Sequence, residues 1–186
     1  MAANDPGTYV DSPGGKIQAV VPFYWNGTSY TASRGGSRTL YVTGTAVGNA
    51  ADLNELTLQS YTLPAGTLAN VGDIVRVTCG GVFGATTDTK NVRLKFDGAA
   101  ALTQTGNLAA TTRWWMQWMI LKTGTGTQTI MGESQSNSTT SGTNNGLLNR
   151  TETNAIPIIV TGQNSTNSVA NSVTCQMFMV EFIPAP

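Results

Sequence analysis

Residues 113–134, RWWMQWMILKTGTGTQTIMGES, hold three of the four tryptophans of the chain within five positions. In an extended strand, alternate side chains leave opposite faces. One face of this strand then carries Trp114, Met116, Trp118 and Ile120. The opposite face carries Trp115, Gln117, Met119 and Leu121. A strand with one face in water reads alternately apolar and polar, so both faces of this strand are predicted to be covered.

The second face of the strand, with Trp115, Gln117 and Met119, has three interpretations. In the first, the N-terminal hairpin or a loop of the same chain folds over it. In the second, another copy of the chain covers it, and these three residues lie at the subunit interface. In the third, the indole of Trp115 is a stacking platform for a sugar ring.

The composition favours strands over long helices. Only 11% of the 186 residues are charged, and Thr and Val, which suit strands, are common. Strand-like runs separated by turn residues lie at 56–63, 73–83, 91–97, 113–122, 127–134, 155–163 and 172–182. Seven or eight such runs without an amphipathic helix predict an all-β antiparallel sandwich or barrel over residues 53–186. The polar stretch 135–154 is predicted to be a long loop or crossover.

Residues 1–52 differ in composition from the rest of the chain and are predicted to form an extended N-terminal arm. They are rich in Gly, Pro and small polar residues and contain one aromatic cluster, VPFYWNGTSYTAS. In that cluster, Asn26-Gly27 indicates a two-residue type I′ hairpin turn. The flanking aromatic residues are Phe23, Tyr24, Trp25 and Tyr30. So short a hairpin rarely stands alone in water, and we expect it to dock on the main domain or on a neighbouring molecule.

The sequence also bounds the compartment and the partners. The first 15 residues lack a charged segment followed by an apolar run, so we expect no signal peptide and synthesis in a cytoplasm. No stretch reaches the roughly 20 apolar residues of a membrane span. The formal net charge is zero and the basic residues are scattered singly, so neither nucleic acid nor an acidic membrane is an expected partner. Cys79 and Cys175 lie in strand-like runs and are expected to be buried thiols.

No pattern in the chain indicates catalysis. The chain contains no histidine, which removes the commonest general base and a common metal ligand. Most of the ten carboxylates lie in turns or at strand ends, where solvated surface is the usual explanation. The glycine-rich KTGTGTQT precedes a strand and opens no helix, so it indicates a hairpin turn. We therefore expect no catalytic residue, no metal site and no cofactor.

The order of several short motifs between residues 56 and 184 resembles the jelly-roll domain of tailed-bacteriophage virion proteins. These motifs are LPAGTL followed by GD and a strand, FGATTDTKNVRLKF, the KTGTGTQ turn and the closing VEFIPA. In that family the place of Trp115 is usually polar, so the tryptophan of this chain indicates an additional contact there. The resemblance implies a jelly-roll sandwich of about eight strands, commonly trimeric, with no catalytic residues to carry over.

The resemblance implies a structural or attachment role, since such domains occur in head decoration proteins, head fibres and distal parts of tail proteins. Our leading hypothesis is a capsid decoration (cement) protein on the outer surface of a phage head, made in the host cytoplasm, that stabilises the head by bridging capsomers. Its partners would be the major capsid protein and itself, as a homotrimer. The arm residues Phe23, Tyr24, Trp25 and Tyr30 would anchor it to the capsid. Trp115, Gln117 and Met119 would form the subunit interface.

The alternative hypothesis places the same domain on a tail fibre or head fibre as a module that binds host surface glycan. In that case the stretch 135–154, rich in Asn, Ser and Thr, is the expected recognition surface. Removal of the arm is expected to separate the two hypotheses, because only the decoration role depends on it for binding to heads.

Overall fold

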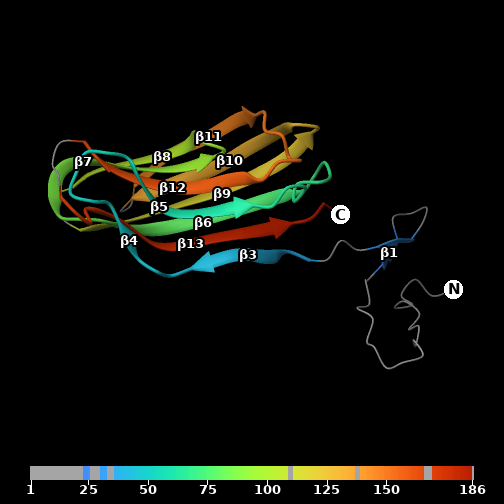
Figure 1. The fold of residues 1–186 in the computed structure, drawn as a ribbon, viewed down its shortest axis with the longest axis horizontal. Helices are drawn as coiled ribbons and strands as arrows, with labels where there is room; N and C mark the ends of the chain where they lie inside the picture. The colour runs from blue at the N-terminus through green and yellow to red at the C-terminus, as the bar shows by residue number, and fades with distance from the viewer. Residues whose placement is uncertain are drawn as a thin grey trace, which may run out of the picture.

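Two antiparallel sheets pack face to face in the computed structural model, which describes residues 23–25, 30–32, 36–108, 111–136, 139–165 and 169–185 (Figure 1). The larger sheet runs in the order β11 (Thr139–Leu148), β10 (Thr127–Ser136), β9 (Thr112–Gly124), β6 (Ile74–Phe83), β13 (Val173–Ile183) and β3 (Arg38–Thr43). A short strand, β4 (Val47–Gly48), also pairs with β13. The smaller sheet runs in the order β5 (Leu56–Leu63), β12 (Ile156–Asn164), β7 (Thr86–Phe96) and β8 (Ala99–Leu108).

The strand order is that of a jelly roll. Eight strands form two four-stranded halves in the orders β3-β13-β6-β9 and β5-β12-β7-β8, and the chain passes back and forth between them. The hairpin of β10 and β11 extends the larger sheet beyond β9. The predicted all-β antiparallel sandwich is therefore confirmed.

The first face of the tryptophan strand, now β9, lies in the core as predicted. Its four apolar side chains, Trp114, Met116, Trp118 and Ile120, are all buried. They belong to one hydrophobic cluster with side chains of the opposing sheet, among them Val92, Leu94, Phe96, Ile158 and Val160. Alternation along β9 thus places its largest apolar surface between the two sheets, where burial stabilises the fold.

The polar stretch 135–154 is mostly strand, and its prediction as a long loop is wrong. β10 continues to Ser136, and β11 pairs with β10 from Leu148 back to Thr139. β11 is an edge strand rich in Thr and Asn, so it lacks the apolar alternation by which a half-buried strand is recognised in sequence. The hairpin turn predicted in KTGTGTQT is confirmed, with Gly126 at a positive φ of 65° between β9 and β10.

The N-terminal region contains a hairpin and two further strands. In the hairpin, β1 (Phe23–Trp25) pairs with β2 (Tyr30–Ala32), and Trp25 lies opposite Tyr30. A two-residue turn at Asn26-Gly27 would place Trp25 opposite Thr28, so that predicted turn is wrong in length. The side chains of the four predicted anchor residues, Phe23, Tyr24, Trp25 and Tyr30, lie outside the described part of the structure.

The strand pairing moves the end of the arm from the predicted residue 52 to a point before residue 38. β3 and β4 pair with β13 and therefore belong to the larger sheet. The side chain of Asn49, buried just after β4, accepts a hydrogen bond of 2.8 Å from the backbone N–H of Val173. Residues 38–49 are thus part of the sandwich because their backbone completes one of its edges.

Candidate functional site

The outer face of the larger sheet, which points away from the core, is the candidate functional surface. Along β9 it carries the three predicted interface residues, Trp115, Gln117 and Met119. Trp115 and Gln117 are half-buried, and Met119 is 40% exposed. Within the described part of the chain, no segment covers this face completely. The interpretation that the chain itself seals it therefore has no support among those residues.

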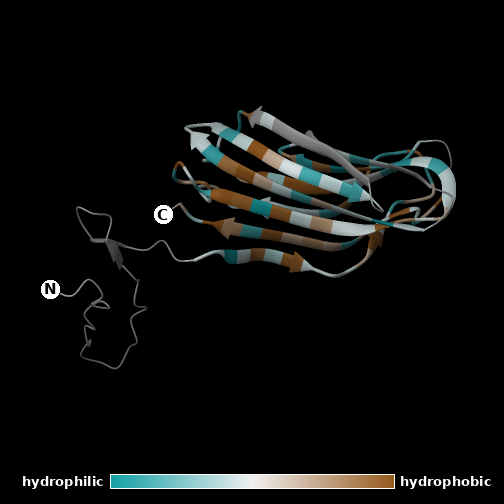
Figure 2. Ribbon diagram, turned by 180° about the vertical axis from the view of Figure 1, so that it is seen from behind, coloured by the Kyte–Doolittle hydropathy of each residue, from teal (hydrophilic) through white to brown (hydrophobic). Residues whose placement is uncertain are grey.

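One end of the outer face carries a pair of methionines, Met119 and Met131, which lie opposite each other on β9 and β10. Met131 is 53% exposed. On the other side of Met119, Arg76 of β6 pairs with Glu181 of β13 at 2.8 Å, so a charged pair borders the methionines. Figure 2 shows apolar and polar residues in alternation along the strands of this sheet. The Met119–Met131 pair, here called the methionine patch, is an accessible apolar surface.

The other end of the outer face contains a hollow of about 470 Å³ beside Trp115. It is lined by Gly80, Gly81, Arg113, Trp114, Trp115, Gln135, Gln176 and Met177. These residues come from the neighbouring strands β9, β10, β6 and β13. On β9 the half-buried Gln117 lies between Trp115 and Met119, so it separates the hollow from the methionine patch.

Two consecutive glycines of β6 create the floor of the hollow. Gly80 lies opposite Trp115, and a Cβ atom there would lie 3.2 Å from the carbonyl oxygen of Trp114 and 3.5 Å from the Cβ atom of Trp115, so a side chain at this position would occupy part of the hollow. Gly81 faces inward, where a Cβ atom would lie 1.8 Å from the carbonyl oxygen of Thr174. Only glycine fits at position 81, whereas glycine at position 80 keeps the outer face open.

Strand irregularities place the polar side chains around the hollow. In β13 the register against β6 shifts between Cys175 and Met177, and both Gln176 and Met177 are exposed. In β10 the register against β11 shifts just before Gln135. Such bulges re-aim side chains and are frequent beside binding sites.

The indole of Trp115 is held in place by a hydrogen bond. Its Nε1–H donates to Oε1 of Gln135 at 2.7 Å, across the β9–β10 pair. That bond uses the amide oxygen of Gln135. The –NH2 group of the same amide is a hydrogen-bond donor and takes no part in the bond to Trp115. Half-buried and fixed in this way, the ring presents a stable aromatic surface at the rim of the hollow.

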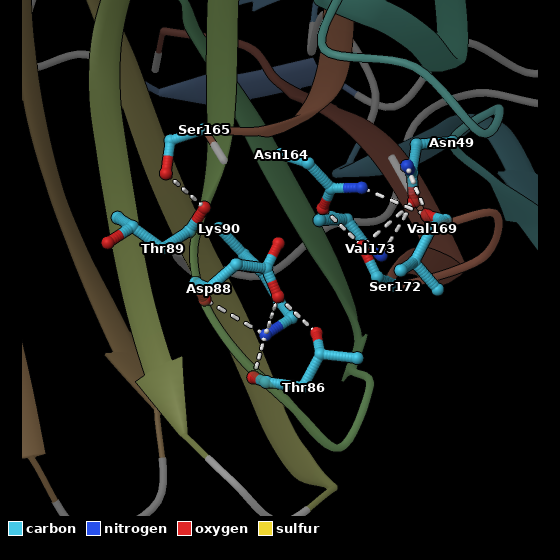
Figure 3. A network of polar contacts seen from close by, with 10 residues as sticks. All are labelled: Asn49, Thr86, Asp88, Thr89, Lys90, Asn164, Ser165, Val169, Ser172 and Val173. Atoms are coloured by element: carbon cyan, nitrogen blue, oxygen red, sulfur yellow. Dashed lines mark hydrogen bonds and ion pairs between the residues drawn. The ribbon is translucent and has the colours of Figure 1, made fainter. Parts of the chain in front are cut away.

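The buried polar groups at one end of the sandwich serve the fold (Figure 3). Lys90 and Asp88 have fully buried side chains and form an ion pair of 3.2 Å. Burial alone would raise the pKa of Asp88, but hydrogen bonds from Thr86 and Lys90 outweigh it and lower the pKa. Their charges compensate each other in place, so we interpret the pair as structural.

The two cysteines are free and buried, as predicted. Burial raises the pKa of the Cys79 thiol well above its ordinary value and that of Cys175 to about 11. Both thiols are therefore protonated and unreactive near neutral pH. Among the residues that the structure describes, no group of three or more His, Cys, Asp or Glu side chains could hold a metal ion. Nor does any helix among them have the length and apolarity to cross a membrane.

Sequence reasoning found Trp115 but missed the residues that make the hollow. Gly80, Gln135 and Gln176 are far apart in sequence and meet Trp115 only through strand register and bulges. One signal was available, because a Gly-Gly pair inside a strand marks a bulge or a close approach of another group.

Comparison with known proteins gives weak structural likenesses only. No protein-family model matches the sequence, and no curated protein sequence matches it. The CBM2 module of the evolved Dit protein of Lactobacillus casei BL23 phage J-1 superposes with a TM-score of 0.38 at 12% identity, over 81% of this chain and 98% of that module. The VP2 subviral particle of infectious bursal disease virus gives a TM-score of 0.35 at 11% identity, over 90% of this chain and 37% of VP2.

Proposed function

We propose that this chain is a non-enzymatic structural protein of a bacteriophage virion, and within that class a decoration protein on the outer surface of the head. The observation that carries the proposal is the accessible methionine patch on a jelly roll whose core is complete without it. Two exposed apolar side chains that lie next to each other support a protein–protein contact at this face. The resemblance of the sequence motifs to phage virion jelly rolls supports the choice of assembly.

The subunit contact of the proposed homotrimer lies at the methionine patch. Met119 and Met131 supply unbranched, adaptable side chains, which suit a contact between two protein surfaces. Gln117 lies beside them at the border, where it donates a hydrogen bond of 3.3 Å to the hydroxyl of Thr78. Trp115 lies beyond Gln117, and in this arrangement its hollow stays open at the outer edge of the contact.

The N-terminal hairpin is the proposed anchor to the major capsid protein. Its aromatic residues are Phe23, Tyr24, Trp25 and Tyr30. Aromatic side chains dominate the binding energy of many interfaces, and an extended arm can reach across a boundary between capsomers. The bridging mechanism is passive, because buried contact area across the boundary must be lost before the shell can open.

Deletion of residues 1–35 tests the decoration role. The truncated chain should fold, because Leu40 is the first described residue that packs against the hydrophobic core, and it should no longer bind expanded phage heads in a co-sedimentation assay. A full-length variant with serine at all four aromatic positions of the hairpin is the matched control and should lose binding as well. Truncated protein that binds heads as tightly as the intact chain contradicts the proposal.

A second candidate function is favoured by one observation, the hollow beside Trp115. A module of a tail fibre or head fibre that binds host surface glycan would use such a site. In this case deletion of residues 1–35 leaves head binding unchanged, while loss of the indole of Trp115 reduces adsorption to cells.

A further inference from the structure

We propose that the hollow beside Trp115 binds one pyranose ring that carries a carboxylate, as in a hexuronic acid. The ring would stack on the indole, its hydroxyls would bond to Gln135 and Gln176, and its carboxylate would pair with Arg113. This inference goes beyond the decoration role and does not depend on it. It gives the second candidate function a ligand class.

The hollow is large enough for a single sugar ring. Its volume of about 470 Å³ lies within the usual range of roughly 300–1,000 Å³ for small-molecule sites. The floor is backbone, because Gly80 has no side chain and lies directly opposite Trp115. A flat ring can therefore lie over this floor with one face against the indole.

The indole is suited to the apolar face of a sugar. An aromatic ring offers a negatively polarised face, and the axial C–H groups of a pyranose present a positively polarised one. The hydrogen bond from Nε1 of Trp115 to Gln135 fixes the indole before any ligand arrives. A pre-ordered ring loses little conformational freedom on binding.

The polar groups around the hollow suit hydroxyls. Gln135 and Gln176 are amides, which both donate and accept, as do sugar hydroxyls. Both lie next to strand irregularities, and Gln176 is exposed at the bulge of β13. A purely apolar occupant would offer these amides no further hydrogen-bond partner, which disfavours an aliphatic ligand.

The charge of the lining selects an anionic sugar over a neutral one. Arg113 contributes a guanidinium, and the eight lining residues include no carboxylate. On β10, the next residue on the same face as Gln135 is Glu133. It lies opposite Gln117, and it is not among the lining residues. A guanidinium binds a carboxylate through two parallel hydrogen bonds, so one acidic substituent is favoured at this rim.

A matched pair of ligands tests the proposal on the full-length chain. Methyl glucuronide and methyl glucoside differ only in the acid at C6, and both are titrated by ligand-observed NMR. The glucuronide should bind about tenfold more tightly than the glucoside, and Arg113→Gln should remove that difference. Trp115→Ala should weaken both sugars by at least about tenfold. Gly80→Val, which places a side chain on the floor of the hollow, should abolish binding of both sugars.

Met119→Ala is the control, because it changes the same strand face outside the hollow and should leave both affinities unchanged. Thermal midpoints show that each variant is folded, and Trp115→Phe, which keeps a stacking ring, should retain part of the binding. Absence of binding by the wild-type chain, or binding that survives both Trp115→Ala and Gly80→Val, overturns the proposal. Equal affinity for the two sugars overturns the role of Arg113. Binding to phage heads tests the decoration role and sugar titration tests the site beside Trp115. Either proposal can therefore fail without the other.

Discussion

Replacement of Trp118 by alanine should lower the free energy of unfolding by about 3–5 kcal/mol. The side chain is 0% exposed and lies between Met116 and Ile120 on the inner face of β9. Its removal leaves a cavity between the two sheets that the neighbouring side chains can fill only in part. Because a domain of this size has a total stability of about 5–15 kcal/mol, the variant should unfold at markedly lower urea concentration.

Trp115→Ala is the matched control for that prediction, since it removes the same side chain three positions away on the other face. It should cost about 1 kcal/mol or less, because Trp115 is only half-buried. Trp118→Phe should lower the free energy of unfolding less than Trp118→Ala does. The Nε1–H of Trp118 has no hydrogen-bond partner among the described residues, so its removal breaks no hydrogen bond. Equal losses for Trp115→Ala and Trp118→Ala contradict the assignment of the two faces of β9.

Replacement of Glu152 by alanine should also cost about 3–5 kcal/mol, through a buried charge. Glu152 is 7% exposed and precedes β12. Its carboxylate accepts hydrogen bonds from the N–H of Gly126 at 2.9 Å and from Gln128 at 2.8 Å. It also lies 3.5 Å from Nζ of Lys122. Without it, the buried ammonium of Lys122 loses its counter-charge, and urea denaturation at pH 7 measures the loss.

The pH dependence separates the charge of Glu152 from its hydrogen bonds. Burial alone would raise the pKa of Glu152, but hydrogen bonds from the backbone and Gln128, together with Lys122, lower it below its ordinary value of 4.5. The resulting stabilisation is present above that value and is lost as pH falls through the lower pKa of the folded state. The free energy of unfolding of the wild type should therefore be higher than that of Glu152→Gln at pH 7. The two values should approach each other in acid, below the ordinary pKa. If the difference in free energy of unfolding between the two proteins stays constant across this pH range, the proposed stabilisation by the ion pair with Lys122 is contradicted.

The strands with strong alternation were predictable from sequence, and those with polar inner faces were not. β9 alternates without a break, and its buried residues were identified one by one. β8 was missed because its inner face includes Gln104, which is fully buried and donates a hydrogen bond to the hydroxyl of Ser136 at 3.0 Å. A polar side chain with a buried partner looks like a solvated one in sequence.

The candidate site was predictable only in part for a different reason. Trp115 stood out because an apolar residue occupied a face expected to be polar. The hollow beside it depends on the pairing of Gly80 with Trp115 and on the bulge at Gln176. Register and bulges arise from the packing of whole sheets, and no spacing within one strand specifies them.

The mass of the full-length chain in solution tests most directly whether a second copy covers the methionine patch. Light scattering should give three times the chain mass of 19.5 kDa at micromolar concentration. Met119→Lys, which places a charge at the proposed contact, should shift the mass toward 19.5 kDa. Val42→Lys, on the exposed face of the edge strand β3, should leave the trimer intact. A wild-type chain that remains at 19.5 kDa would contradict the proposed assembly.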